Sequence, residues 1–337
     1  MPHRWTMQSL MVGATMVCAT PIPVLAQAAP DATGATTAAP PQSAEIVYDI
    51  TNRMTLPVTI DGAGPFAFIV DTGAEHTVIS QELARSLNLR VTGSARIVGV
   101  ARETTADLYR IDNLQLAGLN GTGITVAGLD GAHIGAAGML GIDSMANHRV
   151  LFDFVEQRMD IRPATRSEIH RRPREVDADA IIVTGRRVGG RLILSNASID
   201  GQRVDVVIDT GAQNSIGNRA LTRMVQRQRA ARLRLSDSSA QGANGGLLPV
   251  SRARIERIEI GGVTVQDMPI AFGESPAFAE LNLSRRPALL LGMDALRLFD
   301  RVVVDFTNRR VLFDLPGGSS RLPGQRMAAT DSLPGGG

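Results

Sequence analysis

Hydrophobic and polar side chains alternate along much of this chain, and the same order of segments occurs twice. Residues Ile111–Leu116 and Ile255–Ile260 show the alternation, and a period of about two residues predicts β-strands. An Asp-Gly pair lies between apolar runs at residues 61–62 and again at residues 200–201, which is typical of a β-hairpin turn. The pattern therefore predicts an all-β chain built from hairpins.

Each half also contains one segment with helical spacing. Ser80 and Asn218 both lie nine residues after the aspartate of an Asp-Thr-Gly motif, and both residue types suit the position that caps a helix N-terminus. The apolar stripes that follow these caps are Leu83 with Leu87, and Leu221 with Met224 and Val225. The sequence therefore predicts one short helix in each half.

The most informative repeat is an Asp-Thr-Gly-Ala motif that follows an apolar strand in each half. Its two copies are Asp71, Thr72, Gly73, Ala74 and Asp209, Thr210, Gly211, Ala212. One such motif is usually a polar turn, but two copies in matching contexts predict two carboxyl groups that meet across a pseudo-twofold axis. Like charges about 3 Å apart cannot both ionise, so the pair would share a proton.

The repeat extends well beyond these motifs. Arg53 and Arg191 each lie 18 residues before the motif aspartate. Gly141 and Gly292 each follow a short apolar run downstream of it, and all segments keep their order. The predicted organisation is a signal peptide at residues 1–28, a disordered leader at 29–44, an N-terminal lobe at 45–161, a linker at 162–180, a C-terminal lobe at 181–315 and a disordered tail at 316–337.

The motif segment Asp71–Ile79, together with the Leu-Gly pairs at 140–141 and 291–292, resembles the retroviral-type (retropepsin-like) aspartic proteases. The resemblance covers both lobes and implies two similar acid-protease-like β-barrel lobes, with an active-site cleft between them that holds an extended peptide. The pepsin-like branch fits less well, because its usual Ser after the Gly is Ala74 and Ala212 here. In the family two subunits supply the two loops, whereas one chain supplies both here. A monomer is therefore expected, and a lobe-swapped dimer stays open.

The resemblance implies that Asp71 and Asp209 are the catalytic residues. One ionised carboxylate would take a proton from a bound water, while the other would donate a hydrogen bond to the scissile carbonyl. A coupled pair titrates as a unit, so the two roles stay unassigned. The resemblance also implies that the hydroxyls of Thr72 and Thr210 cross the lobe interface. It further implies that the strands carrying Gly141 and Gly292 pass beneath the loops, where a side chain would clash.

Two glycine-containing segments lie where flaps are expected, between each helix and the next strand. The first is Ile97–Ala101, with Gly99 and Val100 at its centre, and the second is Ser236–Gly246, with Gly242 and Gly245. Such segments can close over a peptide, or they can be plain mobile loops.

The leading prediction is an exported aspartic endopeptidase acting on peptide or protein substrates. The alternative is a catalytically inactive peptide-binding module on the same scaffold, which the two intact aspartates disfavour. No cofactor and no metal are expected, because His133 and His148 have no partners at metal-ligand spacing. A net charge of +2 does not argue for nucleic acid, and the arginines after the second motif indicate a solvated helix face. Glu75 and His76, beside the first motif, are expected to face solvent.

The N-terminus has the features of a secretory signal: Arg4, an apolar core at Leu10–Thr20 and a cleavage pattern at residues 26–28. A secreted or periplasmic protein is therefore expected. An uncleaved N-terminal anchor is the alternative, although the prolines and weak hydrophobicity disfavour a stable membrane span. Finally, Ile46–Ile50 and Val311–Phe313 are apolar segments at the ends of the repeat, and we expect them to pair in a sheet that bridges the lobes.

Overall fold

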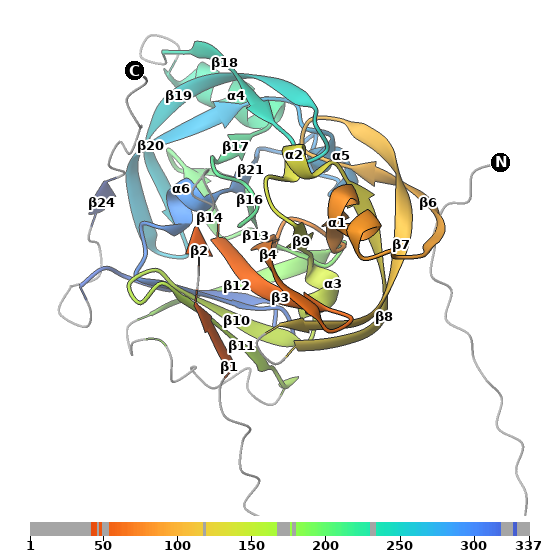
Figure 1. Ribbon diagram of the computed structural model, residues 1–337. Coiled ribbons are helices and arrows are strands. Elements are labelled where there is room, and N and C mark those ends of the chain that lie inside the picture. The colour runs from red at the N-terminus through yellow and green to blue at the C-terminus, as the bar shows by residue number, and fades with distance from the viewer. Residues whose placement is uncertain are drawn as a thin grey trace, which may run out of the picture. The chain divides into compact units, whose positions relative to one another are not determined.

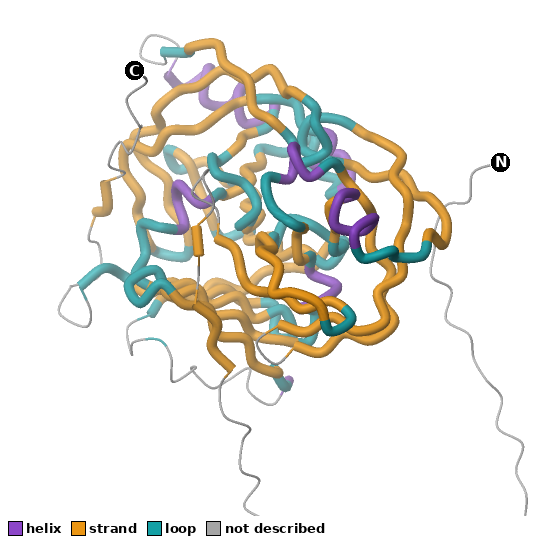
Figure 2. Tube along the Cα trace, viewed as in Figure 1, coloured by secondary structure: helices purple, strands orange, loops and turns teal. Residues whose placement is uncertain are grey.

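The repeated sequence folds into two similar lobes made almost entirely of β-strands (Figures 1 and 2). The computed structural model describes residues 42–45, 47–48, 54–116, 119–166, 176, 180–229, 234–317 and 326–328. The predicted signal peptide lies outside these residues, as do Arg53 and most of the predicted leader, linker and tail. Two described strands overlap the predicted leader and tail: β1 (Gln42–Glu45) lies at the leader's end, and β24 (Arg326–Ala328) lies inside the tail.

The N-terminal lobe is a closed six-stranded barrel with the order β3-β4-β9-β5-β8-β7. Pairing of Ile60 with Leu114 joins β3 to β7 and closes it. Its interior is apolar, with Val58, Phe68 and Ile111 fully buried. The strands of this lobe are β2 (Val47–Tyr48), β3 (Met54–Ile60), β4 (Ala63–Val70), β5 (Val78–Ser80), β6 (Val91–Val98), β7 (Glu103–Leu116), β8 (Leu119–Leu129) and β9 (Gly138–Leu140).

The C-terminal lobe repeats this order with one interruption. The counterpart of β3 is split at residues 195–196, so that its first part pairs with β16 and its second part pairs with β19. The strands of this lobe are β13 (Arg191–Leu194), β14 (Ala197–Ile199), β15 (Gln202–Arg203), β16 (Asp205–Ile208), β17 (Ile216–Gly217), β18 (Ser236–Gln241), β19 (Leu247–Ile260), β20 (Val263–Phe272) and β21 (Ala288–Leu291). In addition, β24 pairs in parallel with β20.

The turn and cap residues act as the sequence predicts. Asp61 and Asp200 have φ angles of 48° and 50° and precede glycines with φ of 81° and 77°, as a tight hairpin turn with two left-handed residues requires. The Ser80 hydroxyl accepts a hydrogen bond from the backbone N–H of Leu83 (3.1 Å). It thereby caps α1 (Gln81–Ser86). The Asn218 side chain caps α4 (Arg219–Arg229) in the same way.

The prediction of a single helix in each lobe is incomplete, because each lobe contains two more helices. These additional helices are α2 (Gly131–Ile134), α3 (Ile142–Met145), α5 (Pro276–Glu280) and α6 (Met293–Leu296). Each is only about one turn long, which is too short for a helical periodicity to show in the sequence.

One part of the larger sheet joins the lobes, with the order β1-β11-β10-β22-β23-β12, and we call this part the interlobe sheet. Its central pairing, β10 with β22, joins one lobe's strand to the other's, with Val150 opposite Val304. Across this seam the Arg301 guanidinium donates to the buried carboxylate of Asp153 (3.1 Å). The further strands of this interlobe sheet are β10 (His148–Asp153), β11 (Arg158–Pro163), β12 (Ile181–Val188), β22 (Arg301–Asp305) and β23 (Arg310–Asp314).

The predicted pairing of Ile46–Ile50 with Val311–Phe313 is wrong, although an interlobe sheet exists. The described part of the first segment, Val47–Tyr48, pairs with β3. Val311–Phe313 lies between β22 and β12 instead. The duplicated hairpins β10–β11 and β22–β23 pair through their first strands, β10 and β22. The outer edge of β23 therefore pairs with β12. Apolar composition predicts burial but does not select the partner strand.

We expect the interlobe sheet to be indispensable for folding. Val311, Leu312 and Phe313 are fully buried, and burying such side chains contributes about 1.5–3 kcal/mol each, close to the whole stability of many domains. Ending the chain after Arg310 should therefore abolish cooperative thermal unfolding, as measured by circular dichroism. A chain ending after Leu315 keeps β23 and serves as the control. A shorter chain that melts at the full-length temperature would contradict this assignment.

Candidate active site

The two Asp-Thr-Gly loops lie side by side at the ends of β4 and β16, near the centre of Figure 1. Within each lobe the motif strand runs parallel to a strand carrying a Leu-Gly pair, β9 or β21. The backbone N–H of Asp71 donates to the carbonyl of Leu140 (3.0 Å), and that of Asp209 donates to the carbonyl of Leu291 (3.0 Å). The parallel strands thus fix where each aspartate leaves its barrel.

Thr72 and Thr210 join the two loops through four buried hydrogen bonds. The Thr72 hydroxyl donates to the carbonyl of Ile208 (2.9 Å), and the Thr210 hydroxyl donates to the carbonyl of Val70 (2.7 Å). Each hydroxyl also accepts the backbone N–H of the opposite threonine, at 3.0 and 3.2 Å. Every hydroxyl therefore reaches into the other lobe, which is the arrangement that the resemblance implied.

The loop glycines bring the two carboxyl groups together. A Cβ atom added to Gly73 would lie 2.6 Å from Cγ of Asp209, and one added to Gly211 would be closer still to Cγ of Asp71. Each carboxyl group therefore lies against the glycine of the opposite loop. Only glycine permits this approach, so the structure explains the third residue of both motifs.

Backbone amides hold the inner oxygen of each carboxyl group. Asp71 Oδ1 accepts hydrogen bonds from the N–H groups two and three residues later, at 2.8 and 2.9 Å. Asp209 Oδ1 does the same at 3.1 and 3.0 Å. The donors are Gly73, Ala74, Gly211 and Ala212. These bonds orient the carboxyl groups and favour their ionised forms.

Burial dominates the titration of the pair. It raises the pKa of Asp71 above its ordinary value, against the opposing effect of the Gly73 amide and the positive charge of Arg191. Burial, together with the negative charge of Asp71, raises the pKa of Asp209 to about 8. One carboxyl group can therefore keep its proton while its neighbour is ionised, which is what a shared-proton pair requires.

Arg191 is also part of the site. The sequence singled out this residue by its repeated spacing but did not predict its contacts. Its side chain is only 15% exposed. Its Nε–H donates to the carbonyl of Gly73, in the opposite lobe, and its Nη1 lies 3.8 Å from the carboxylate of Glu75. The positive charge opposes the rise in the pKa of both motif aspartates. The repeated 18-residue spacing was the only sequence signal for this role, and Arg53, its counterpart, lies outside the described residues.

Gly141 and Gly292 lie directly beneath the loops, as the resemblance implied. A Cβ on Gly292 would lie 2.8 Å from the carbonyl carbon of Asn214, and one on Gly141 would lie 2.6 Å from the carbonyl oxygen of His76. The N–H of each glycine donates to a hydroxyl of the loop above, that of Thr77 at 3.1 Å or Ser215 at 3.0 Å.

A carboxylate supports each of these hydroxyls, and sequence reasoning did not identify it. Asp143 accepts from the Thr77 hydroxyl and Asp294 accepts from the Ser215 hydroxyl, both at 2.7 Å. Burial raises the pKa of Asp294. Burial acts on Asp143 in the same direction, but the hydrogen bonds from His76 and Thr77 outweigh it and lower the pKa of that carboxyl. The Gly-x-Asp pattern that occurs in both halves, at 141–143 and 292–294, was the sequence signal that could have identified these two carboxylates.

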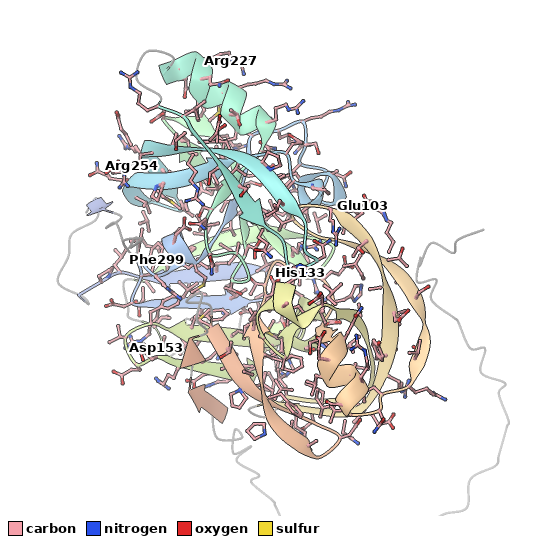
Figure 3. The ribbon with its side chains drawn as sticks, turned by 45° about the horizontal axis from the view of Figure 1, so that its top comes forward. Glu103, His133, Asp153, Arg227, Arg254 and Phe299 are labelled. Atoms are coloured by element: carbon pink, nitrogen blue, oxygen red, sulfur yellow. The ribbon has the colours of Figure 1, made fainter. Side chains whose placement is uncertain are left out.

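The predicted flaps are the tips of two long β-hairpins. Gly99 and Val100 lie in the turn between β6 and β7, while Gly242 and Gly245 lie in the turn between β18 and β19. The structure brings these tips into contact with each other: a Cβ on Gly99 would lie 2.7 Å from side-chain atoms of Asn244. Figure 3 shows the β18–β19 hairpin reaching α2, where His133 is labelled.

The charged residues beside the first motif, Glu75 and His76, face solvent and also form ion pairs. Glu75 and His76 have side chains that are 49% and 67% exposed, as expected, but both also have ionic partners. His76 Nδ1 lies 3.4 Å from the carboxylate of Asp143, and its hydrogen bond to Asp143 raises the pKa of His76. Within the described ranges, no three His, Cys, Asp or Glu side chains gather as metal ligands.

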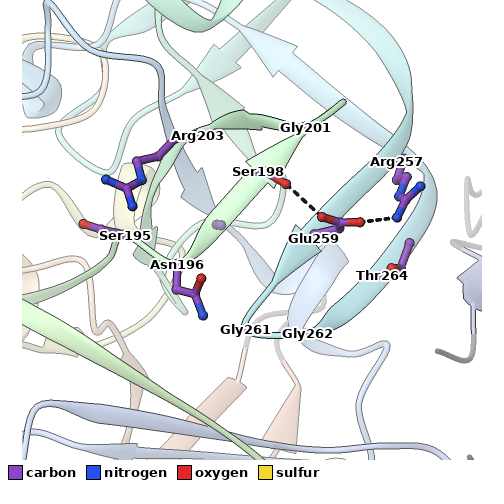
Figure 4. Close-up of a pocket in the computed structure, with 11 residues that line it drawn as sticks. Ser195, Asn196, Ser198, Gly201, Arg203, Arg257, Glu259, Gly261, Gly262 and Thr264 are labelled. Carbon is purple, nitrogen blue, oxygen red and sulfur yellow. Dashed lines mark hydrogen bonds and ion pairs between the residues drawn. The ribbon is translucent and has the colours of Figure 1, made fainter. Parts of the chain in front are cut away.

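A surface pocket of about 540 Å³ lies apart from the motif aspartates, in the C-terminal lobe (Figure 4). Three of its polar side chains already interact with one another, since Glu259 accepts from the Ser198 hydroxyl (3.0 Å) and pairs with Arg257. It contains neither Asp71 nor Asp209, so we assign no chemistry to it. As for membranes, none of the helices in the described part of the chain has the length and apolar character needed to span a bilayer.

Comparison with known protein families gives a match in both lobes. Residues 56–144 and 195–295 match a protein family described as aspartyl protease, and the two regions together make up just over half of the 337 residues. The two regions contain the two motif loops, one in each lobe. No curated protein matches the chain.

The raised pKa of Asp209 predicts how stability depends on pH. A carboxyl group that binds its proton more tightly in the folded state stabilises the fold below its unfolded pKa, near 4, and that contribution is lost as pH rises through about 8. Asp209→Asn removes the buried charge. Its melting temperature should therefore exceed that of the wild type at pH 8.5 and match it at pH 3, measured by differential scanning fluorimetry.

The exposed Asp112→Asn (77% exposed) is the control for that measurement, and it should change neither value. An Asp209→Asn variant that melts below the wild type at pH 8.5 would show that the Asp209 carboxylate stabilises the fold rather than opposing it.

Proposed function

Since the chain belongs to the aspartyl protease family, we propose that it is a single-chain, retroviral-type aspartic endopeptidase of exported proteins or peptides. The observation that carries the proposal is the meeting of Asp71 and Asp209 in two buried loops that Thr72 and Thr210 lock together. A pair of buried carboxyl groups with raised pKa values holds one proton over a wide pH range, which supplies an acid and a base from identical side chains.

In the proposed reaction the ionised carboxylate takes a proton from a water molecule as that water attacks the scissile carbonyl carbon. The protonated carboxyl group donates a hydrogen bond to the carbonyl oxygen, where negative charge develops. As the tetrahedral intermediate collapses and the C–N bond breaks, the carboxyl group that took the proton from water transfers it to the leaving amine. No covalent enzyme intermediate forms. The backbone amides bonded to each Oδ1 keep both carboxyl groups oriented, so the site is preorganised.

Apolar side chains on both sides of the pair favour a substrate with apolar groups next to the scissile bond. One buried cluster includes Ile69, with Ala74 packed against it, and the other includes Val207, with Val188 packed against it. Each cluster thus includes a residue of the strand that leads into a motif loop. Burial of an apolar substrate side chain against either one would add binding free energy roughly in proportion to the area removed from water.

The alternative, an inactive peptide-binding module, is disfavoured by the electrostatics of the site. Burying two neighbouring carboxyl groups destabilises the fold unless one stays protonated, and a binding module gains nothing from that arrangement. Both loops come from one chain, which supports a catalytically competent monomer over a lobe-swapped dimer. The N-terminal sequence supports export by a cleaved signal.

We expect Asp71→Asn and Asp209→Asn each to abolish peptide cleavage while leaving the fold intact. Asparagine keeps the shape of the side chain but can be neither the base nor the shared acid, and general acid–base catalysis typically contributes about 10²–10⁴-fold. The measurement is cleavage of a random peptide library followed by mass spectrometry, with Asp112→Asn as the control. Near wild-type turnover by either variant, with its mass verified, would refute the assignment.

The dependence of activity on pH follows from the same pair. Activity needs one proton on the pair, so it should follow a bell with an optimum at roughly pH 4.5–6.5. Its alkaline limb should reflect the raised pKa of Asp209. Replacing both Ala74 and Ala212 with Ser offers each carboxylate an extra donor, which favours the ionised form and should shift both limbs to lower pH. An optimum near pH 2, or an upward shift in the double variant, would show that another group controls the pair.

A further inference from the structure

The two flap tips are held together by hydrogen bonds between lobes, not merely placed near each other. The Arg102 guanidinium donates twice to the backbone carbonyl of Asn244, from Nε at 2.9 Å and from Nη2 at 2.7 Å. In return, the Asn244 side-chain amide donates to the backbone carbonyl of Arg102 at 2.7 Å. The contact is therefore reciprocal, and each tip supplies both donors and acceptors.

The Arg102 carbonyl links this contact to the internal structure of the first tip. The same oxygen accepts the backbone N–H of Gly99 (2.9 Å), which closes the turn between β6 and β7. In the second tip, the N–H of Gly242 donates to the carbonyl of Gly246 (2.9 Å). Each tip is thus a closed turn, and the two turns engage as preformed units.

The glycines of both tips are needed for close approach rather than for mobility alone. A Cβ on Gly99 would lie 2.7 Å from Asn244 side-chain atoms, and a Cβ on Gly246 would lie 2.8 Å from Cγ of Arg102. Gly245 has a left-handed φ of 79° and lies against the ring of His133, on α2. The tips therefore interlock, and the second tip also rests on the opposite lobe.

Apolar contacts place each tip over the other lobe's apolar cluster. Val100 and Ala101, from the first tip, pack against the C-terminal-lobe cluster that contains Val207. Ala243, from the second tip, packs against the N-terminal-lobe cluster that contains Ile69. Val207 and Ile69 each lie two residues before a motif aspartate. Each tip therefore packs on the apolar cluster that includes the strand leading to the other lobe's motif loop.

The closed contact also contains a feature that opposes it. Asn244 is only 5% exposed, and its Oδ1 has no hydrogen-bond partner among the residues that the structure describes. A buried acceptor without a partner weakens the state that contains it. Arg102, in contrast, is exposed, so water can compete for its hydrogen bonds. Both features weaken the closed contact.

We propose that Arg102 and Asn244 are positioning residues that form a reversible latch between the flaps, holding both tips closed over Asp71 and Asp209. An extended peptide could then reach the two carboxyl groups only after the latch opens, and the latch would close again around the bound chain. This inference rests on the proposed endopeptidase function for its kinetic consequence, but the latch itself can be observed without activity.

The latch can be tested by measuring the distance between the flaps. Cys18 is the only cysteine, so the full chain with Cys18→Ser accepts spin labels at Thr105→Cys and Ser239→Cys. Both positions are exposed, one on each flap hairpin. Double electron–electron resonance should give one short distance for this parent. Arg102→Ala loses two hydrogen bonds to the Asn244 carbonyl, so it should broaden the distribution toward longer distances and lower the ratio of closed to open molecules about tenfold. Asn244→Ala loses one hydrogen bond, because its backbone carbonyl remains, and it should shift the distribution in the same direction by a smaller factor.

Two further variants separate a latch from a general structural role. Arg102→Lys keeps the charge but loses the forked geometry, so it should give an intermediate distribution. Arg110→Ala removes an exposed arginine of the same hairpin that pairs with Asp112 in its own strand, and it should leave the distances unchanged. Thermal unfolding of all variants should stay within a few degrees of the parent. If the Arg102 and Asn244 variants kept the parent distribution, the latch would be wrong.

Kinetics on a peptide that the parent cleaves give the second readout. If the latch positions the substrate, Arg102→Ala should lower kcat and raise KM, changing kcat/KM roughly tenfold or more, with partial rescue by Arg102→Lys. Distances that respond in a parent without protease activity would support the latch and refute the endopeptidase. Unchanged distances and unchanged kinetics in an active parent would refute the latch and leave the endopeptidase standing.

Discussion

The reciprocal hydrogen bonds of Thr72 and Thr210 are the constraint on which the site depends. Each hydroxyl donates to a strand carbonyl of the other lobe and accepts the backbone N–H of the other threonine. Four buried bonds that cross one interface fix the relative position of the two loops, because moving either loop would leave buried polar groups without partners. Asp71 and Asp209 directly precede these threonines, so the same bonds fix the positions of their carboxyl groups.

The electrostatics of the pair follow from this geometry. The loops meet so closely that each carboxyl group lies on the other loop's glycine, and burial raises the pKa of both aspartates. The positive charge of Arg191, which donates to the Gly73 carbonyl, opposes this rise in pKa. The chain therefore holds its two acids in an unfavourable environment by means of a rigid backbone. Strong interlobe contacts elsewhere, in the sheet around β10 and β22, maintain the two lobes in register.

The sequence could predict the parts of this structure that depend on local pattern or on repetition. Alternation located β7 and β19, the Asp-Gly pairs located the hairpins, and the repeated motif identified Asp71 and Asp209 as neighbours. It could not predict contacts that depend on tertiary placement. Nothing local to Arg102 or Asn244 indicates that residues 142 positions apart exchange hydrogen bonds. The partner of Val311–Phe313 was likewise missed, because several strands of similar composition could have paired with it.

Because the two lobes belong to one chain and differ in sequence, the two sides of this site are not equivalent. A site formed by two identical subunits is symmetric and has no such difference between its sides. On one side of the aspartate pair the loop continues with Glu75 and His76, and on the other side it continues with Gln213 and Asn214, all of them solvent-accessible. Only one flap tip presents an asparagine. A peptide has different groups at its two ends, so a bound chain and the same chain reversed would meet different charges here. The two lobes can therefore discriminate the N-to-C polarity of whatever they bind.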